Sequence, residues 1–346
     1  MKKQIVILAE KKLDPVLSKM AVIAIRYLQD QIVAVIDSTY AGKTVGEVLG
    51  FGGEIPIYSS LDESLQHQPN TLIIGVLPRG GTVPSEWYPI IISAIQNRMN
   101  IINGLQEFLS TIPEFSVLSK KYGVKIVDLK MIKDSSAIAK GRAKNFRSKI
   151  VLTIGTNHNA GKLTTTLELV KELQRRGKSA DWLPTGQSGI LIKGKGTAFE
   201  MVRGQFISGE IESAAAKIDG NYEYVFIQGQ GALHNSVLAP VTIGLLQGTL
   251  PDALVLCHRL TDNGLNKDSI SSLIQIYESI LSYNKPAKVA AVSLNTYKIS
   301  DEKALQAIQE LSQFLKLPVT DPVRFGAEDL ADILISYFST YKKIIQ

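Results

Sequence analysis

Apolar and polar positions follow two repeating patterns along the chain. Short β-branched runs predict buried strands, and longer stretches with an apolar residue every three or four positions predict amphipathic helices. In the first half, the expected strands cover residues 4–9, 32–36, 71–76 and 124–127, and the expected helices cover 18–29 and 85–98. In the second half, the expected strands cover 149–154, 179–183, 222–228, 253–257 and 288–294, and the expected helices cover 161–176, 269–283, 303–315 and 328–341. Such alternation predicts parallel sheets with helices on both faces.

Two series of this kind predict two α/β domains, for which a length of 346 residues is ample. We expect an N-terminal Rossmann-like parallel-sheet domain over residues 1–132 and a C-terminal P-loop NTPase-like α/β domain over residues 149–346. Between them, residues 133–148 are basic and poor in apolar side chains. We interpret this segment as a solvated linker. A share in attracting an anionic ligand is the alternative interpretation.

Composition indicates a soluble cytoplasmic protein. Apolar residues make up 45% of the chain and charged residues 20%, and no apolar run approaches the length of a membrane span. The single cysteine, Cys257, excludes an intrachain disulfide framework and fits a reducing compartment. Much of the net charge of +6 falls in the expected linker, so it does not indicate a nucleic-acid partner. We expect a small-molecule substrate, no membrane partner and assembly into a homo-oligomer.

The strand expected at 149–154 runs into a phosphate-binding loop. Its residues, with the start of the following helix, are Gly155, Thr156, Asn157, His158, Asn159, Ala160, Gly161, Lys162, Leu163 and Thr164. The helix would direct N–H groups and its positive dipole end at an anion, and Lys162 would add a charge. The standard motif has glycine six places before the lysine and Ser or Thr directly after it, but Thr156 and Leu163 hold these places. Because leucine cannot ligate magnesium, phosphate binding is favoured over magnesium-dependent NTP hydrolysis. A plain strand-to-helix turn with a surface lysine is the alternative.

The first strand does not lead into a dinucleotide site. Close approach to a pyrophosphate requires Gly-x-Gly-x-x-Gly, whereas residues 9–14 read AEKKLD. Further on, the run Gly42-Lys43-Thr44 imitates the end of a phosphate loop, but Asp37 stands where the leading glycine belongs. We treat that run as a coincidence.

Three histidines follow expected strand ends in the second half: His158, His234 and His258. If those strands are parallel, their carboxyl ends meet at one edge of the sheet, where doubly wound folds bind ligands. One of these imidazoles would then act as a general base or hydrogen-bond donor; an ordinary structural role is the alternative. Cys257 beside His258 also suggests a zinc site. The closely spaced pairs of ligands typical of such a site are missing, so no metal is expected.

Two glycine-bounded segments are candidates for substrate binding. Gln187 and Ser188 lie in the small-residue run 185–190, and Arg79 lies between a strand end and two glycines. Glycine-rich loops expose N–H groups to a ligand, and an arginine there is suited to a carboxylate or phosphate. Plain surface turns are the competing interpretation.

Several of these loops resemble the signatures of a known family. They are TGQSGI at 185–190, GQGALH at 229–234, GLLQGTLPDA at 244–253 and DPVRFG at 321–326, together with GVLPRGG at 75–81 and NGL at 103–105. The chain resembles a two-domain P-loop family long catalogued as of unknown function, which includes the D-glutamate N-acetyltransferase of the Dgc type. Its phosphate loop is also similar to that of dethiobiotin synthetase.

The resemblance implies transfer of acetyl from acetyl-CoA to the amino group of D-glutamate, with the cofactor phosphates on the phosphate loop. For that reaction, loop position alone suggests His158 or His234 as the base, with Gln228 also in the catalytic set. The substrate would be held by residues from several loops: Arg79, Gln187, Ser188, Gln230, His258 and Arg324.

Relative to the family pattern, three carboxylates are amides in this chain: Asn157, Gln205 and Gln228. Amides keep hydrogen bonds but neither hold a hard divalent cation as carboxylates do nor act as general bases. Two alternatives to acetyl transfer therefore stay open. One is an ATP-dependent ligase or kinase similar to dethiobiotin synthetase, and the other is a non-catalytic nucleotide- or CoA-binding protein.

Overall fold

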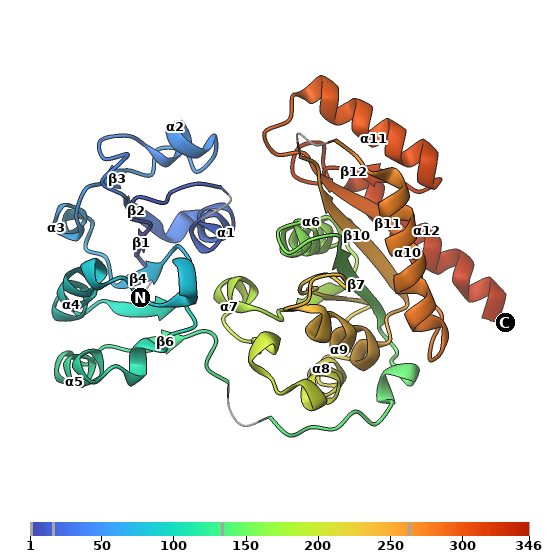
Figure 1. Cartoon of the computed structure of the whole chain (residues 1–346), viewed down its shortest axis with the longest axis horizontal. Coiled ribbons are helices and arrows are strands. Elements are labelled where there is room, and N and C mark those ends of the chain that lie inside the picture. Colours follow the sequence, from blue (N-terminus) through green and yellow to red (C-terminus); the bar gives the residue numbers. More distant parts are fainter. Residues whose placement is uncertain (1–2, 16–17, 133–134, 262–263, 346) are drawn as a thin grey trace. The chain divides into compact units, whose positions relative to one another are not determined.

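The structure, a computed structural model, describes residues 3–15, 18–132, 135–261 and 264–345. The chain divides into two compact units, coloured along the sequence in Figure 1. Unit 1 comprises Met1–Lys133 and Gln187–Met201, and unit 2 comprises Asp134–Gly186 and Val202–Gln346. Each unit is an α/β structure built on a parallel sheet, which confirms the predicted fold class.

Within the described part of unit 1, six parallel strands pair in the order β3-β2-β1-β4-β5-β6. They are β1 Ile5–Leu8, β2 Ile32–Ile36, β3 Ile57–Tyr58, β4 Thr71–Ile74, β5 Asn100–Asn103 and β6 Ile126–Asp128. The helices are α1 Lys19–Tyr27, α2 Val45–Leu49, α3 Leu61–Ser64, α4 Tyr88–Gln96, α5 Pro113–Tyr122 and α7 Gln187–Lys193. The strand order is that of a Rossmann-like domain. Apolar clusters on both faces of the sheet bury β1 and β4 completely.

In unit 2 the sheet has the order β12-β11-β10-β7-β9-β8, again all parallel over the residues described. The strands are β7 Lys149–Gly155, β8 Ala180–Leu183, β9 Tyr224–Ile227, β10 Ala253–Arg259, β11 Lys288–Asn295 and β12 Val319–Thr320. The helices are α6 Lys162–Arg175, α8 Ile207–Ala216, α9 Ala239–Thr249, α10 Lys267–Ser282, α11 Asp301–Leu315 and α12 Glu328–Ile345. Because β9 is buried along its whole length, both faces of this sheet must be covered.

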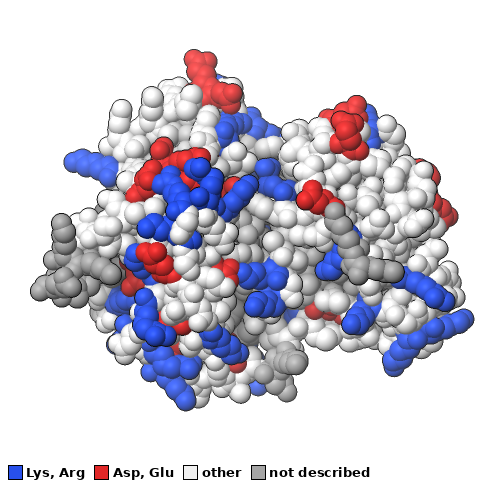
Figure 2. All heavy atoms as spheres, turned by 180° about the vertical axis from the view of Figure 1, so that it is seen from behind, with Lys and Arg blue, Asp and Glu red and all other residues white. Residues whose placement is uncertain are grey.

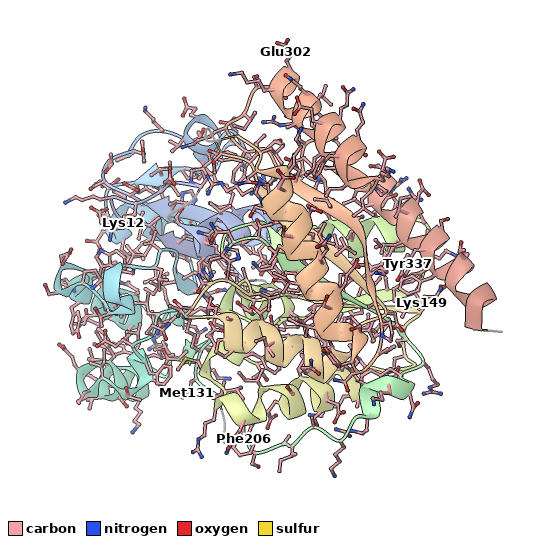
Figure 3. The ribbon with its side chains drawn as sticks, turned by 45° about the vertical axis from the view of Figure 1, so that its right-hand side comes forward. Lys12, Met131, Lys149, Phe206, Glu302 and Tyr337 are labelled. Atoms are coloured by element: carbon pink, nitrogen blue, oxygen red, sulfur yellow. The ribbon has the colours of Figure 1, made fainter. Side chains whose placement is uncertain are left out.

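Polar contacts mark the amino edge of the unit 2 sheet. Lys149, the first residue of β7, donates to the carboxylate of Glu223 at 2.8 Å and lies over the ring of Tyr224 at 4.4 Å. On α12, the hydroxyl of Tyr337 donates to the carbonyl of Asp252, directly before β10. Figure 3 labels Lys149 and Tyr337. The loops that contain the candidate site residues lie at the opposite, carboxyl edge of this sheet.

The expected linker differs from the prediction, because described residues 135–148 are bound to unit 2. Backbone N–H groups of Ser136 and Ala137 donate to Glu210 on α8, each at 3.0 Å. The N–H groups of Lys140 and Arg142 donate to Glu212, which is 1% exposed. Residues 133 and 134 lie outside the described part. Carboxylates on α8 therefore hold the segment along the helix, where a solvated linker was expected.

The run 185–190 also differs from its expected form, because it contains the start of helix α7. Leu191 of α7 is 7% exposed and belongs to the apolar cluster that contains Met20, Ala21 and Ala24 of α1. The two helices pack against each other within unit 1. Residues 187–201 therefore belong to the N-terminal unit, although both flanking segments belong to unit 2.

In unit 1, the loop after β1, which lacks the glycines of a dinucleotide site, is held by a carboxylate at the end of β2. The buried carboxylate of Asp37 accepts hydrogen bonds from the N–H groups of Leu13 at 2.9 Å, Lys12 at 3.2 Å and Thr39 at 2.9 Å. The side chain thus ties the β1–α1 loop to the end of β2. The run Gly42-Lys43-Thr44 belongs to a helix start, since Thr44 caps α2 and forms a capping box with Glu47.

On the face drawn in Figure 2, Lys and Arg side chains lie in several groups with Asp and Glu among them. None of the helices in the described ranges is both long enough and apolar enough to cross a membrane.

Candidate functional site

The candidate site lies at the carboxyl edge of the unit 2 sheet. Strand β7 sits between β10 and β9, so the loops that follow these three strands are neighbours. The phosphate loop, residues 155–162, joins β7 to α6. Gly161 takes a φ of 102° directly before the helix, a conformation that favours glycine. The first turn of α6 then directs its N–H groups toward the loop, which is the arrangement that binds phosphates in this fold class.

Lys162 is the cation of this loop, and its side chain is 6% exposed. The ammonium donates to the carbonyl of Asn157 at 2.8 Å and to that of His158 at 3.4 Å. The side chain lies so close to Gly155 that a Cβ there would stand 2.8 Å from Nζ. Lys162 is therefore held along the inside of the loop, with a positive charge under the loop backbone.

The loop after β9 is packed against the same lysine. A Cβ on Gly229 would stand 1.7 Å from the carbonyl oxygen of Thr153 and 3.1 Å from Cδ of Lys162. The N–H of Gly229 donates to the hydroxyl of Thr153 at 3.0 Å. Glycine is therefore required at position 229, because the β9 loop approaches β7 to backbone contact.

Hydroxyl groups near the loop are turned into the sheet. Thr165 bonds to Ser293 of β11 at 2.7 Å, and Thr166 donates to the carbonyl of Lys162 at 2.9 Å. Leu163, in the place where the standard motif carries a magnesium-ligating hydroxyl, is 4% exposed. The residues after Lys162 thus support the helix and the sheet.

Two amide side chains of the predicted site connect neighbouring strand ends. Gln228 is buried, and its side-chain oxygen accepts from the N–H of Thr185 at 3.3 Å. The Thr185 hydroxyl donates to the carbonyl of Gln228 at 2.6 Å. A Cβ on Gly186 would stand 2.0 Å from the Gln230 amide nitrogen, so the 185–186 turn and the β9 loop are in contact. Gln228 therefore positions this turn.

The three candidate histidines follow three adjacent strands but differ in burial. His158 and His234 are exposed. His258, at the end of β10, is half-buried, and its Nδ1 lies 2.7 Å from the hydroxyl of Thr156 in the phosphate loop. Burial lowers the pKa of His258 below its ordinary value. Of the three, His258 contacts the loop through its ring, while the exposed pair is accessible to a substrate.

Lowered basicity of His258 predicts a pH-dependent stability. Because the unfolded chain binds this proton more readily, the free energy of unfolding should fall as the pH drops below about 6.5 toward the folded pKa. We expect the unfolding temperature of the wild type to decrease between about pH 7 and pH 5, and the His258→Gln variant to lose part of that decrease. Thermal melts across this pH range measure both. Identical pH profiles would contradict the assignment.

Cys257 and Tyr277 lie under the loop as structural groups. Burial raises the pKa of the Cys257 thiol to about 11, so the thiol stays protonated near neutral pH. The Tyr277 hydroxyl donates to the carbonyl of Gly155 at 3.2 Å, and burial raises its pKa. No group of three His, Cys, Asp or Glu side chains suited to a metal ion occurs in the described part of the chain.

Family models match both units. A domain of unknown function described as the DUF1611 P-loop domain matches residues 137–331, and a DUF1611 Rossmann-like domain matches residues 38–131. The chain belongs to the DUF1611 family. A crystal structure of a DUF1611 protein from Anabaena variabilis is similar, with a TM-score of 0.89, 32% identity and coverage of 96% of this chain and 99% of that one.

Two curated relatives of this DUF1611 protein carry the name D-glutamate N-acetyltransferase. The one from Pseudoalteromonas is 34% identical over 278 residues, which is 78% of this chain and 83% of the relative. The one from Tritonibacter scottomollicae is 32% identical over 282 residues, which is 80% of this chain and 84% of the relative.

The remaining predicted residues of the DUF1611 protein have the following places in their own units. Arg324 donates to the carbonyl of Ile299 at 2.8 Å and lies 3.4 Å from the carboxylate of Asp301, so it braces the start of α11. Arg79 opens a 3₁₀ turn, and its side chain lies outside the described part. Gln205 is exposed in the turn before α8. Gln187 and Ser188 belong to α7 of unit 1.

Sequence reasoning missed Arg259, the last residue of β10. Its Nε is buried, and no described residue accepts a hydrogen bond from it. Arg259 is paired in register with Asn295 of β11, whose side chain lies beside Gly161 of the phosphate loop. An arginine next to His258, two residues past the strand expected at 253–257, was the available signal. Together with Lys162 and the start of α6, it gives the carboxyl edge of the sheet a second basic residue.

Proposed function

We propose that this DUF1611 protein is an N-acetyltransferase that moves acetyl from acetyl-CoA to the amino group of D-glutamate or a related acidic amino acid. The observation that carries the proposal is the carboxyl edge with its two basic residues, Lys162 and Arg259, and the first turn of α6. Asn157 and Gln228 contribute neutral amides there. An anionic cofactor is therefore favoured by the protein's own charges. The names of the two curated relatives support the same reaction.

The residues fit the phosphates of CoA. Arg259 has a buried Nε with no acceptor among the described residues, and a phosphate oxygen is an acceptor of matching charge. Lys162 would place its ammonium and the α6 N–H groups under the same phosphates. When bound, acetyl-CoA supplies a thioester whose carbonyl carbon accepts an amine.

Protein groups must then accept one proton and supply one. The acceptor nitrogen forms a bond to the carbonyl carbon, the carbon–sulfur bond breaks, and the sulfur leaves as a thiol after taking up a proton. His158 or His234, both exposed at the carboxyl edge, would receive the proton that the amine loses. Backbone N–H groups of the Gly229–Gly231 turn would donate to the carbonyl oxygen as negative charge develops on it.

The test is release of free thiol from acetyl-CoA on addition of D-glutamate, with the N-acetylated product identified by mass spectrometry. We expect equal amounts of thiol and product, and none without an acceptor. Absence of both would contradict the proposal. Acetyl-CoA binding without turnover would indicate a non-catalytic binding protein, and tighter binding of ATP with magnesium would indicate the ligase or kinase.

Replacing Arg259 with methionine is expected to weaken acetyl-CoA binding at least about tenfold, because a hydrogen bond to a charged group contributes about 1.5–3 kcal/mol. The unfolding temperature should not fall, since the change removes a half-buried arginine whose buried Nε has no protein partner among the residues described. Titration calorimetry on wild type and variant measures the affinity. Arg203→Met, at an exposed arginine of the same unit, is the matched control. Equal affinity of all three proteins would refute the role of Arg259.

A further inference from the structure

Unit 1 contains a cluster of charged side chains that the phosphate loop does not use. Lys19 opens α1, the helix that follows β1, and Lys130 lies two residues after β6. Glu200 lies in the 3₁₀ turn Phe199–Met201, which follows α7. Lys130 is 3% exposed, and its Nζ lies 3.7 Å from Oε1 of Glu200. Lys130 and Glu200 thus form a pair, and Lys19, on the helix that packs against α7, interacts electrostatically with both.

One atom of this cluster has no partner in the described ranges. Oε2 of Glu200 is buried and accepts no hydrogen bond there. The separation of 3.7 Å to Lys130 involves the other oxygen and is longer than a hydrogen bond. A buried carboxylate oxygen without a donor is unfavourable, because it has lost water and gained no replacement. The cluster therefore offers one strong acceptor that a donor group would satisfy.

The cluster also carries an uncompensated positive charge. Lys130 is paired with Glu200, and the same carboxylate acts electrostatically on Lys19: burial lowers the pKa of both lysines while Glu200 acts in the opposite direction. A further anion beside the lysines would stabilise their charged forms. The cluster is thus complementary to a molecule that brings both a cationic donor and an anion.

The residues next to Lys19 lie where α1 and α7 are packed together. The Ser188 hydroxyl lies 3.5 Å from the sulfur of Met20, the neighbour of Lys19. A Cβ on Gly104 would stand 3.2 Å from Cε of Met20 and 3.3 Å from Cγ of Gln187, so glycine allows the close packing of this junction. Gln187 and Ser188, which the sequence analysis assigned to substrate binding, therefore lie where α7 meets α1.

We infer that the cluster of Lys19, Lys130 and Glu200 binds the acidic amino acid that accepts the acetyl group. Glu200 accepts a hydrogen bond from the amino group, and the two lysines take carboxylates. A compound with an ammonium group and two carboxylates would supply a donor to Glu200 and an anion to each lysine. This inference rests on the proposed function, because it names where that reaction's acceptor is held.

The alternative is a purely structural ion cluster that fixes the 3₁₀ turn to unit 1. The two interpretations differ in what a ligand does. A structural cluster changes the stability of the free protein and is indifferent to D-glutamate. A binding site gains stability when D-glutamate is added, because a ligand that binds only the folded state raises the unfolding temperature.

The test is titration calorimetry of the full chain with D-glutamate and with glutarate, which has both carboxylates but no amino group, in the absence of acetyl-CoA. We expect the wild type to bind D-glutamate at least about tenfold more tightly than glutarate. The Glu200→Gln variant should lose that preference and keep glutarate binding, and Lys130→Met should weaken both ligands. Glu54→Gln and Lys125→Met, at exposed positions of unit 1, are matched controls that should leave binding unchanged.

Several results would overturn the inference. They are equal binding of D-glutamate and glutarate by the wild type, no binding of D-glutamate at all, or unchanged affinities in both cluster variants. The wild-type comparison stands even if a variant does not fold. Lys162→Ala should retain D-glutamate binding. If D-glutamate binds as expected but no thiol is released with acetyl-CoA, the proposed function fails while the binding site stands. If thiol is released but the Glu200 and Lys130 variants bind D-glutamate as the wild type does, the binding site fails while the proposed function stands.

Discussion

Lys162→Ala is expected to lower the affinity for acetyl-CoA by about ten- to a hundredfold, the largest loss of binding among the substitutions at the phosphate loop. A charged donor to phosphate contributes about 1.5–3 kcal/mol, and each 1.4 kcal/mol is tenfold in affinity. The variant also loses the two hydrogen bonds from Nζ to the carbonyls of Asn157 and His158, so the loop backbone is less well held. Turnover with D-glutamate should fall at least in proportion.

The matched control is Lys171→Ala, which removes an exposed lysine from the same helix. It should bind acetyl-CoA as the wild type does. Lys162→Arg is not expected to restore affinity, because Nζ already stands within 2.8 Å of where a Cβ on Gly155 would be. Affinities by calorimetry for all three variants decide the matter. Unchanged affinity of Lys162→Ala for acetyl-CoA would refute the phosphate loop as its binding site.

Gly229→Ala is expected to have the largest effect on stability. The new methyl group would meet the carbonyl oxygen of Thr153 at 1.7 Å, a backbone atom that cannot move without disturbing β7. Overpacking of this kind lowers the free energy of unfolding by about 3 kcal/mol. For a protein of this size, the unfolding temperature should fall by about 5–10 °C. Acetyl-CoA binding should weaken as well, because the displaced loop also contacts Lys162.

Gly204→Ala is the control for this substitution, since a Cβ at position 204 meets nothing within 4 Å. Its unfolding temperature should stay within about 2 °C of the wild type. Differential scanning calorimetry on the three proteins gives the comparison. Similar stability of Gly229→Ala and Gly204→Ala would show that the β9 loop yields to the methyl group.

Local signals were sufficient for most of the central strands. The β-branched runs at 32–36, 71–76 and 149–154 contain β2, β4 and most of β7, because a buried parallel strand is a continuous apolar run. Short edge strands lack such a run. β3 and β12 have two residues each, and their pairing is decided by the neighbouring strand.

The helix α2 was hidden within a glycine-rich stretch, although a local signal was present. Thr44 followed three residues later by Glu47 is a capping box, and the structure uses it as one. For α7, no local signal was available. Gly189 and the small residues before it are typical of a loop, and the helix is stabilised by the burial of Leu191 in the apolar cluster of unit 1.

The phosphate loop was predictable because its residues are contiguous. We predicted that His158, His234 and His258 lie at one edge of the sheet because they follow parallel strands. In the structure these strands, β7, β9 and β10, are neighbours. In contrast, Lys19, Lys130 and Glu200 come from three distant segments, and no spacing in the sequence connects them. Such a cluster becomes visible only when the fold brings its members within reach.

The membership of α7 in unit 1 has a consequence for dissection of the protein. The chain passes between the units after Lys133, again after Gly186 and once more after Met201. A fragment that stops at residue 132 would therefore leave the Met20, Ala21 and Ala24 side of α1 without Leu191, as bare apolar surface. Autonomous expression of the N-terminal domain would require residues 187–201 to be grafted onto it, which a conventional truncation series does not provide.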